Sequence, residues 1–122
     1  MDKKKILIVE DSPTMRDMVS YRLQASGYET ETASCGEEAL KKIKELKPDL
    51  VLLDVKMPGM NGFEVCQRSK SDPETKAVPI IFLTTAAQES DIIKGKELGA
   101  DGYLTKPYDG KELIKEIGRI LN

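Results

Sequence analysis

Five polar residues each follow a short stretch that has the pattern of a β-strand: Glu10, Asp11, Asp54, Thr84 and Lys106. The carboxyl ends of parallel strands meet at one edge of a sheet, so we expect these side chains to lie close together. Carboxylates, a hydroxyl and a lysine are the groups that a phosphoryl transfer needs. Asp54 is the expected nucleophile, because it ends a central strand and precedes a loop rich in Pro and Gly.

The three carboxylates also predict a metal ion. Carboxylates that pack together repel one another, and they stay ionised only if a cation lies among them. Oxygen ligands without His or Cys favour a hard ion. We therefore expect Mg²⁺, or alternatively Mn²⁺, beside Glu10, Asp11 and Asp54. Lys106 then offers a positive charge, and Thr84 a hydroxyl donor, to a bound anion.

Composition excludes several other chemistries. The 122 residues contain no histidine, so Ser-His-Asp triads, histidine metal sites and histidine bases are absent. Cys35 and Cys66 form no CxxC pair, and we expect two small buried thiols. The net charge of −2 argues against a nucleic-acid-binding protein. No apolar run is long enough for a membrane span or a signal peptide, so we expect a cytoplasmic protein.

The elements that must position the polar residues alternate along the chain. The patterns predict strands over 5–10, 28–33, 50–53, 79–83 and 101–105, and helices over 13–26, 36–46, 63–71, 90–98 and 110–121. In the first helix, Met15, Met18, Val19 and Leu23 recur at helical spacing, and Ile92 and Ile93 are expected to face inward. Asp109 and Glu112 have the spacing of a capping box for the last helix.

Strict alternation of strands and helices predicts an α/β fold with a doubly wound parallel sheet and helices on both faces. For five strands the simplest order is 2-1-3-4-5. The length fits one domain over 1–122, and no further domain is expected after the last helix.

Four segments resemble the receiver domain of bacterial two-component response regulators: ILIVEDS at 6–12, LLDVKMPGMNG at 52–62, FLTT at 82–85 and GADGYLTKP at 99–107. The resemblance covers the whole chain, and the four segments in order are far more specific than any one alone. It implies a flavodoxin-like (βα)5 fold. The segment 12–16 resembles single-domain chemotaxis receivers, whereas 63–75 looks more like receivers that precede cyclic-di-nucleotide synthase domains.

The resemblance implies a role for each matching residue of the acidic cluster. Asp54 matches the phosphoacceptor. Glu10 and Asp11 match the acidic pair that holds Mg²⁺, with Asp54 and the backbone carbonyl of Lys56 as further ligands. Lys106 matches the lysine that pairs with the phosphoryl group, and Lys106–Pro107 would be a cis peptide.

The resemblance also implies a switch. Thr84 matches the hydroxyl that moves toward the phosphoryl group, and Tyr103 matches the aromatic ring that follows it. The surface formed by helix 90–98, strand 101–105 and the last helix would then change shape and bind a target protein. Candidate residues of this surface are Ile93, Lys96, Tyr103, Lys111 and Ile114.

The implied partners are a histidine kinase or a histidine phosphotransfer protein, with acetyl phosphate as a small alternative donor. The implied protein is not an enzyme, beyond assisting its own phosphorylation and dephosphorylation. It would act as a monomer or as a phosphorylation-dependent dimer.

Alternative functions make different demands on the same positions. A phosphatase of the haloacid-dehalogenase type needs an Asp where Lys56 stands. A phosphate-independent interaction module needs no intact site, yet no acidic or lysine position is missing. A flavin-binding protein needs a phosphate loop where Glu10 and Asp11 would repel a phosphate. Two details bear on rates: Lys56 could shield a phosphoryl group, and Thr85 could restrict access of the donor.

Overall fold

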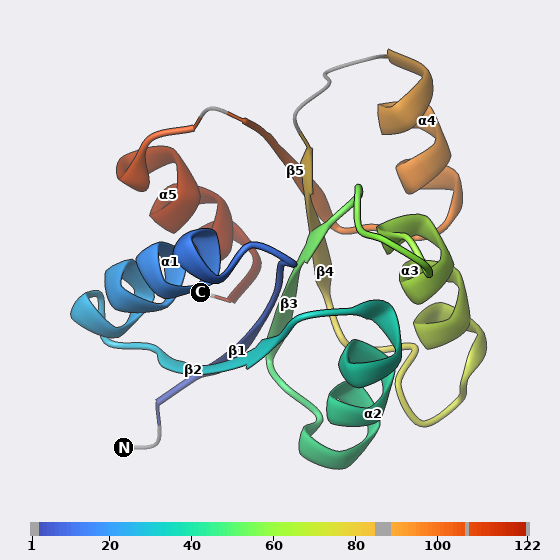
Figure 1. Cartoon of the computed structure of the whole chain (residues 1–122), viewed down its shortest axis with the longest axis horizontal. Helices are drawn as coiled ribbons and strands as arrows, with labels where there is room; N and C mark the ends of the chain where they lie inside the picture. Colours follow the sequence, from blue (N-terminus) through green and yellow to red (C-terminus); the bar gives the residue numbers. More distant parts are fainter. Residues whose placement is uncertain (1–2, 85–88, 107, 122) are drawn as a thin grey trace.

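A computed structural model describes residues 3–84, 89–106 and 108–121, except for the side chains of Thr84 and residues 89–91. Five strands alternate with five helices (Figure 1). The order is β1 (Lys5–Val9), α1 (Pro13–Ala25), β2 (Glu29–Ala33), α2 (Gly36–Leu46), β3 (Leu50–Asp54), α3 (Gly62–Ser71), β4 (Ile80–Thr84), α4 (Glu89–Glu97), β5 (Gly102–Thr105) and α5 (Gly110–Leu121). The predicted elements are confirmed, with ends that differ by at most one residue.

The five strands form one parallel sheet in the order β2-β1-β3-β4-β5, as predicted. Helices α1 and α5 cover one face, and α2, α3 and α4 cover the other (Figure 1). Strand β1 pairs with both β2 and β3, so the chain winds outward in opposite directions from this point. No helix within the described part of the chain is long and apolar enough to cross a membrane.

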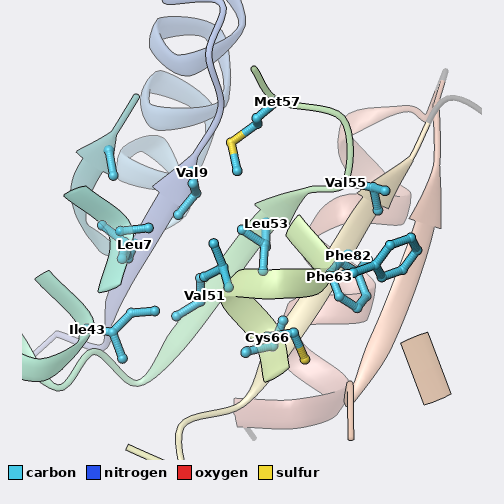
Figure 2. Close-up of a cluster of buried hydrophobic side chains, with 14 of the residues drawn as sticks. Leu7, Val9, Ile43, Val51, Leu53, Val55, Met57, Phe63, Cys66 and Phe82 are labelled. Carbon is cyan, nitrogen blue, oxygen red and sulfur yellow. The ribbon is translucent and has the colours of Figure 1, made fainter. Parts of the chain in front are cut away.

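Alternating strand residues build a core on each face of the sheet. Leu7, Val9 and Val51 face the α2–α3 layer (Figure 2), whereas Ile6 and Ile8 face the α1–α5 layer. Every residue of β3 is buried, because this strand is central and has helices above and below it. The edge strand β2 is more exposed, as its alternating polar sequence predicts.

Two helix faces differ from the prediction. Ile93 was expected to face inward, but 49% of its surface is exposed. The reason is the phase of α4: Gly95 packs against Tyr103, and a residue two positions away points to the opposite side of a helix. On α1, Met18 is 61% exposed, and the buried positions are Val19 and Leu23. Of the two cysteines, Cys66 is buried as expected and Cys35 is half-buried.

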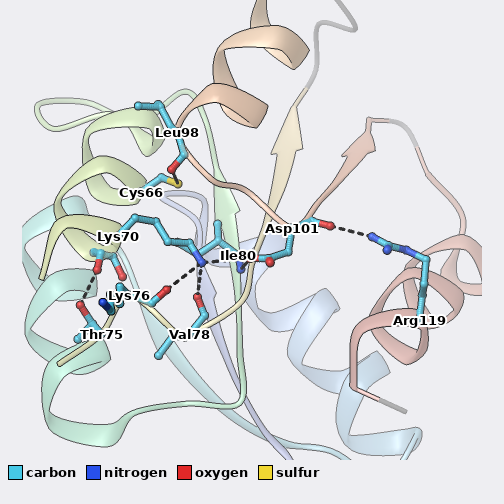
Figure 3. A network of polar contacts seen from close by, with 10 residues as sticks. Cys66, Lys70, Thr75, Lys76, Val78, Ile80, Leu98, Asp101 and Arg119 are labelled. Carbon is cyan, nitrogen blue, oxygen red and sulfur yellow. Dashed lines mark hydrogen bonds and ion pairs between the residues drawn. The ribbon is translucent and has the colours of Figure 1, made fainter. Parts of the chain in front are cut away.

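A polar network ties elements together at the amino ends of the strands (Figure 3). The Lys70 ammonium of α3 donates to the carbonyls of Val78 (2.9 Å) and Lys76 (3.3 Å) and to the Asp101 carboxylate (3.2 Å). The same Asp101 oxygen accepts the amide of Ile80 at 2.8 Å. One lysine therefore links α3, the start of β4 and the segment before β5.

Candidate functional site

The carboxyl ends of the strands bring the predicted polar residues to one edge of the sheet. Glu10 directly follows β1, Asp54 ends β3, and Lys106 follows β5. Val9 pairs with Leu53 across β1 and β3, so Glu10 and Asp54 extend from neighbouring strands at the same level. This is also where the direction of winding reverses, the usual position of a ligand site in such sheets.

Glu10, Asp11 and Asp54 form a compact acidic cluster. Each offers a carboxylate oxygen, and these oxygens lie within 4.8 Å of one another. Glu10 and Asp54 are buried, whereas Asp11 is exposed to solvent. Three oxygen donors that converge from the ends of two strands match the ligand preference of Mg²⁺, which uses few carboxylates and keeps several waters. The residues present therefore fit a hard divalent cation, open to solvent on the Asp11 side.

Lys106 supplies positive charge to the cluster. Its ammonium lies 3.2 Å from Glu10 Oε2 and 3.7 Å from Asp54 Oδ1. The lysine side chain is mostly buried, with 15% of its surface exposed, so the ion pairs are shielded from bulk water. The ammonium is thus held close to any anion that reaches Asp54.

The Asp54 carboxyl has a pKa of about 7, compared with an ordinary value of 3.8. Burial is the largest cause, and a hydrogen bond with Glu10 adds to it because the bond needs a proton on one carboxyl. The positive charge of Lys106 and the Lys56 amide, which donates to Asp54 Oδ1 at 3.3 Å, act in the opposite direction. Near neutral pH the Glu10–Asp54 pair therefore holds a proton that a divalent cation would displace.

The loop after β3 passes very close to Asp54. The Gly62 amide donates to the Val55 carbonyl at 2.9 Å, and a Cβ at position 62 would lie 2.3 Å from the Asp54 carbonyl oxygen. Only glycine fits this approach. Gly62 thus returns the chain to the end of β3 and keeps the segment that includes Lys56 beside the acidic cluster. The Lys56 side chain itself is exposed.

Tyr103 points inward, toward α4. Its hydroxyl donates to the Ile92 carbonyl at 2.8 Å, and its ring stacks on Phe82 with centroids 6.1 Å apart. Burial raises the pKa of this phenol. A Cβ at Gly95 would lie 2.5 Å from the Tyr103 oxygen, so the absence of a side chain at position 95 makes room for the ring.

Some predicted positions fall outside the described residues. Thr84 ends β4, where it pairs with Thr105, but its side chain is not described. Thr85 and Pro107, and with Pro107 the expected cis peptide, also lie outside the description. The predicted switch contact and the cis peptide therefore remain predictions.

The predicted target surface lies around the edge strand β5, between α4 and α5 (Figure 1). Ile93, Lys96 and Lys111 are exposed on the two helices. Tyr103 and Ile114 are half-buried, and Ile114 packs against the α1–α5 core. The exposed part of this surface is therefore mainly on α4 and at the start of α5.

Two residues near the cluster were not predicted. Arg16 of α1 donates to the backbone carbonyls of Glu10 and Asp11. The Tyr108 hydroxyl is buried, and no group within the described residues hydrogen-bonds it. Burial, with the negative charges of Glu10 and Asp54, raises the pKa of Tyr108 to about 12. The sequence pattern does place Arg16 in the first turn of the helix that follows the acidic pair. A side chain at that position can reach back over the loop, and this is the feature from which the contact could have been found.

Known proteins resemble this chain in both sequence and architecture. Residues 6–118 match the family described as response regulator receiver domain. The chain is 42% identical to protein PilH of Pseudomonas aeruginosa over 117 residues, which cover 96% of this chain and 97% of PilH. It is 44% identical to the alkaline phosphatase synthesis transcriptional regulatory protein PhoP of Bacillus subtilis, covering 97% of this chain and 48% of that protein.

The relatives differ in how much of their own length this chain covers. The chain spans about half the length of several curated transcriptional regulators that it matches, such as PhoP, but nearly all of PilH. Among solved structures, the chemotaxis response regulator CheY4 of Vibrio cholerae superposes with a TM-score of 0.92 at 41% identity. That match covers 98% of this chain and 100% of the CheY4 chain.

Proposed function

Because this chain belongs to the response regulator receiver family, we propose that it is a phosphoacceptor switch of a two-component phosphorelay. Members of this family are signalling switches rather than classical enzymes. The observation that carries the proposal is the position of Asp54: a buried carboxyl at the end of the central strand, with Lys106 at 3.7 Å and two further carboxylates beside it.

Asp54 would receive the phosphoryl group. An Asp54 carboxylate oxygen attacks the phosphorus, the bond from phosphorus to the donor breaks, and the donor leaves with the electron pair of that bond. The product is an acyl phosphate on Asp54, which water later hydrolyses to aspartate and inorganic phosphate. A histidine kinase, a histidine phosphotransfer protein or acetyl phosphate would serve as donor, and the absence of histidine in this chain fits a donor histidine on the partner.

Glu10, Asp11 and Asp54, with the Lys56 carbonyl, would hold Mg²⁺ or Mn²⁺, which when bound supplies positive charge to the phosphoryl oxygens. Lys106 would turn from the carboxylates toward the new phosphoryl group, a short movement because its ammonium already lies 3.7 Å from Asp54 Oδ1. Thr84 would donate its hydroxyl to the same group. Because the pKa of Asp54 is about 7, a bound cation would shift the nucleophile toward its ionised form near neutral pH.

The output would be a change at the α4–β5–α5 surface that alters binding of a target protein. Tyr103 connects this surface with β4 through its stacking on Phe82, which is two residues before Thr84. Beryllofluoride would test phosphorylation-dependent dimerisation by size-exclusion chromatography, where an unchanged apparent mass would contradict it.

The proposal is tested by intact-mass spectrometry after incubation with acetyl phosphate. We expect one added phosphoryl group in the wild type with Mg²⁺, none in EDTA and none in Asp54→Asn. Asp17→Asn is the matched control, because it removes an exposed carboxylate on α1 and should leave the adduct unchanged.

An adduct that persists in Asp54→Asn would place the phosphoacceptor elsewhere. If the wild type shows no adduct, beryllofluoride is added, because it reports site formation without a covalent step. Failure to respond to beryllofluoride as well would overturn the proposal and favour a phosphate-independent interaction module.

A further inference from the structure

Arg16 holds the loop that carries the acidic pair. Its Nη1 donates to the Glu10 carbonyl at 2.7 Å and to the Asp11 carbonyl at 3.2 Å. Arg16 lies in the first turn of α1, where Ser12 caps the helix and the Ser12 carbonyl accepts the Arg16 amide at 3.0 Å. The helix that follows the loop thus supplies the side chain that reaches back over it.

The two contacts fix the backbone rather than the carboxylates themselves. The Glu10 amide already donates to the Ala33 carbonyl of β2 at 3.1 Å, so Arg16 completes the restraint on that residue from the other side. Asp11 is exposed, and its carbonyl is held by the same guanidinium nitrogen. Two consecutive carbonyls bound to one nitrogen atom leave little freedom in the peptide between them, and hence in the directions in which both side chains leave the chain.

We propose that Arg16 is a positioning residue for the divalent-cation site, which it pre-organises by fixing the backbone of Glu10 and Asp11. This inference rests on one part of the proposed function, namely that the carboxylate cluster binds Mg²⁺. Groups that orient metal ligands commonly change metal affinity by one to two orders of magnitude. Arg16 acts on backbone atoms, so it is placed outside the set of residues that touch the ion or the phosphoryl group.

Electrostatics and positioning predict opposite signs for the removal of Arg16. A guanidinium near the cluster repels a divalent cation, so the loss of its charge alone would strengthen Mg²⁺ binding. Loss of the backbone restraint would weaken binding, because the free loop must then be ordered when the metal enters. The sign of the change in affinity therefore separates the two effects without further analysis.

The test measures Mg²⁺ affinity by isothermal titration calorimetry on the full chain at pH 7.5 and constant ionic strength, with no phosphoryl donor present. For Arg16→Met we expect Mg²⁺ to bind about 10-fold more weakly than to the wild type. Arg22→Met is the matched control, since it removes the same charge from the same helix farther from the acidic loop. We expect its Kd to be unchanged or slightly lower.

Equal or tighter Mg²⁺ binding by Arg16→Met would overturn the inference and leave the proposed function intact. Absence of Mg²⁺ binding by the wild type would instead contradict the metal site itself. A purely structural role for Arg16 would lower the melting temperature equally with and without Mg²⁺ and leave the Kd unchanged. If Arg16→Met does not fold, Arg16→Gln provides the same comparison, because it also removes the guanidinium while keeping a polar side chain on the half-buried surface.

Discussion

At the scale of single residues, Asp54 is the group whose environment departs most from that of an ordinary side chain. Its folded pKa of about 7 lies far above the ordinary value of 3.8. Between these two pH values the unfolded chain has lost a proton that the folded chain keeps. The contribution of this group to folding is therefore fully present below pH 3.8 and is lost as the pH rises through 7.

Asp54→Asn should consequently stabilise the metal-free protein, and more so at higher pH. We expect a gain in the free energy of unfolding of about 2–4 kcal/mol at pH 8 in EDTA, because Asn removes the buried ionised carboxylate. Urea denaturation of both proteins at several pH values from 4 to 8 measures it. The gain should shrink as the pH falls toward 4. An equal gain at every pH would show that repacking, and not ionisation, is the cause.

The sequence predicted the chemical groups of the site well, because their types and their positions after strands are both readable. Glu10, Asp54 and Lys106 meet as expected. The contact of Arg16 could not be predicted in the same way, since a carbonyl acceptor leaves no trace in the sequence. The buried hydroxyl of Tyr108 could not be predicted either, because it depends on how the segment after β5 packs on the α1–α5 core.

At the scale of elements, the phase of α4 explains both a wrong prediction and the position of Tyr103. The adjacent residues Ile92 and Ile93 led to the prediction that their side of α4 is buried. The structure turns Gly95 toward the sheet, because the ring of Tyr103 occupies the space that a side chain there would fill. Ile92, one turn before Gly95, is half-buried, so the prediction was wrong for Ile93 alone. The spacing of apolar residues along α4 cannot predict this orientation, because the Tyr103 ring that fills the space belongs to β5.

Gly95→Ala should displace Tyr103 from its inward position. The added methyl would lie 2.5 Å from the phenol oxygen, so the hydrogen bond to the Ile92 carbonyl must break. NMR spectra of the tyrosine rings would show the change. We expect a net effect on the free energy of unfolding within about 1 kcal/mol, because the better helix propensity of Ala offsets the lost bond.

The double variant Gly95→Ala/Tyr103→Phe provides the control for this prediction. Phe lacks the oxygen that makes the 2.5 Å contact but keeps the ring carbon that the new Cβ would approach to 2.8 Å. The ring should therefore return only part of the way toward its inward position, and the double variant should be more stable than the two single changes predict. Unchanged Tyr103 resonances in Gly95→Ala would contradict the prediction.

Lys70 supplies a polar connection between α3 and the segment that leads into β4. Lys70→Met keeps the aliphatic stem but removes the ammonium donor from the Val78 carbonyl, and it leaves the Asp101 carboxylate with the Ile80 amide as donor. We expect a loss of about 1–3 kcal/mol in the free energy of unfolding, measured by urea denaturation. Mg²⁺ affinity should not change, because the network lies at the opposite ends of the strands.

Lys76→Met is the matched control for Lys70→Met. The Lys76 side chain is exposed, so its removal should alter stability by less than about 0.5 kcal/mol. A loss of similar size in both variants would mean that net charge, and not the hydrogen-bond network, is responsible.

At the scale of the whole molecule, the alternation of strands and helices was sufficient to predict the sheet order. The right-handed crossover rule and the single reversal of winding leave few arrangements for five parallel strands. Element ends were less accurate, since they depend on caps and local contacts. The two cores followed from alternation within the strands, which places Leu7 and Ile8 on opposite faces.

A bound divalent cation should stabilise the whole fold, with a dependence on pH. At a Mg²⁺ concentration of 100 times the Kd, the gain in the free energy of unfolding should be about 2.7 kcal/mol. The gain at a fixed Mg²⁺ concentration should be larger at pH 8 than at pH 6, because protonation of Asp54 competes with the metal below pH 7. Thermal unfolding with Mg²⁺ and with EDTA at both pH values measures it.

Asp54→Asn is the control for the metal effect. It lacks the competing proton, so any remaining stabilisation by Mg²⁺ should vary less between pH 6 and pH 8. Equal stabilisation of the wild type at both pH values would contradict a site that includes Asp54.

The network around Lys70 (Figure 3) lies at the amino ends of the strands, whereas Glu10 and Asp54 lie at the carboxyl ends of β1 and β3. Mutations that strengthen or weaken this end leave the reactive groups untouched, so the two ends can diverge independently during evolution. A lineage can adjust its tolerance of temperature at one end while natural selection preserves the chemistry at the other. The same separation offers protein engineers a place to insert stabilising changes away from the acidic cluster.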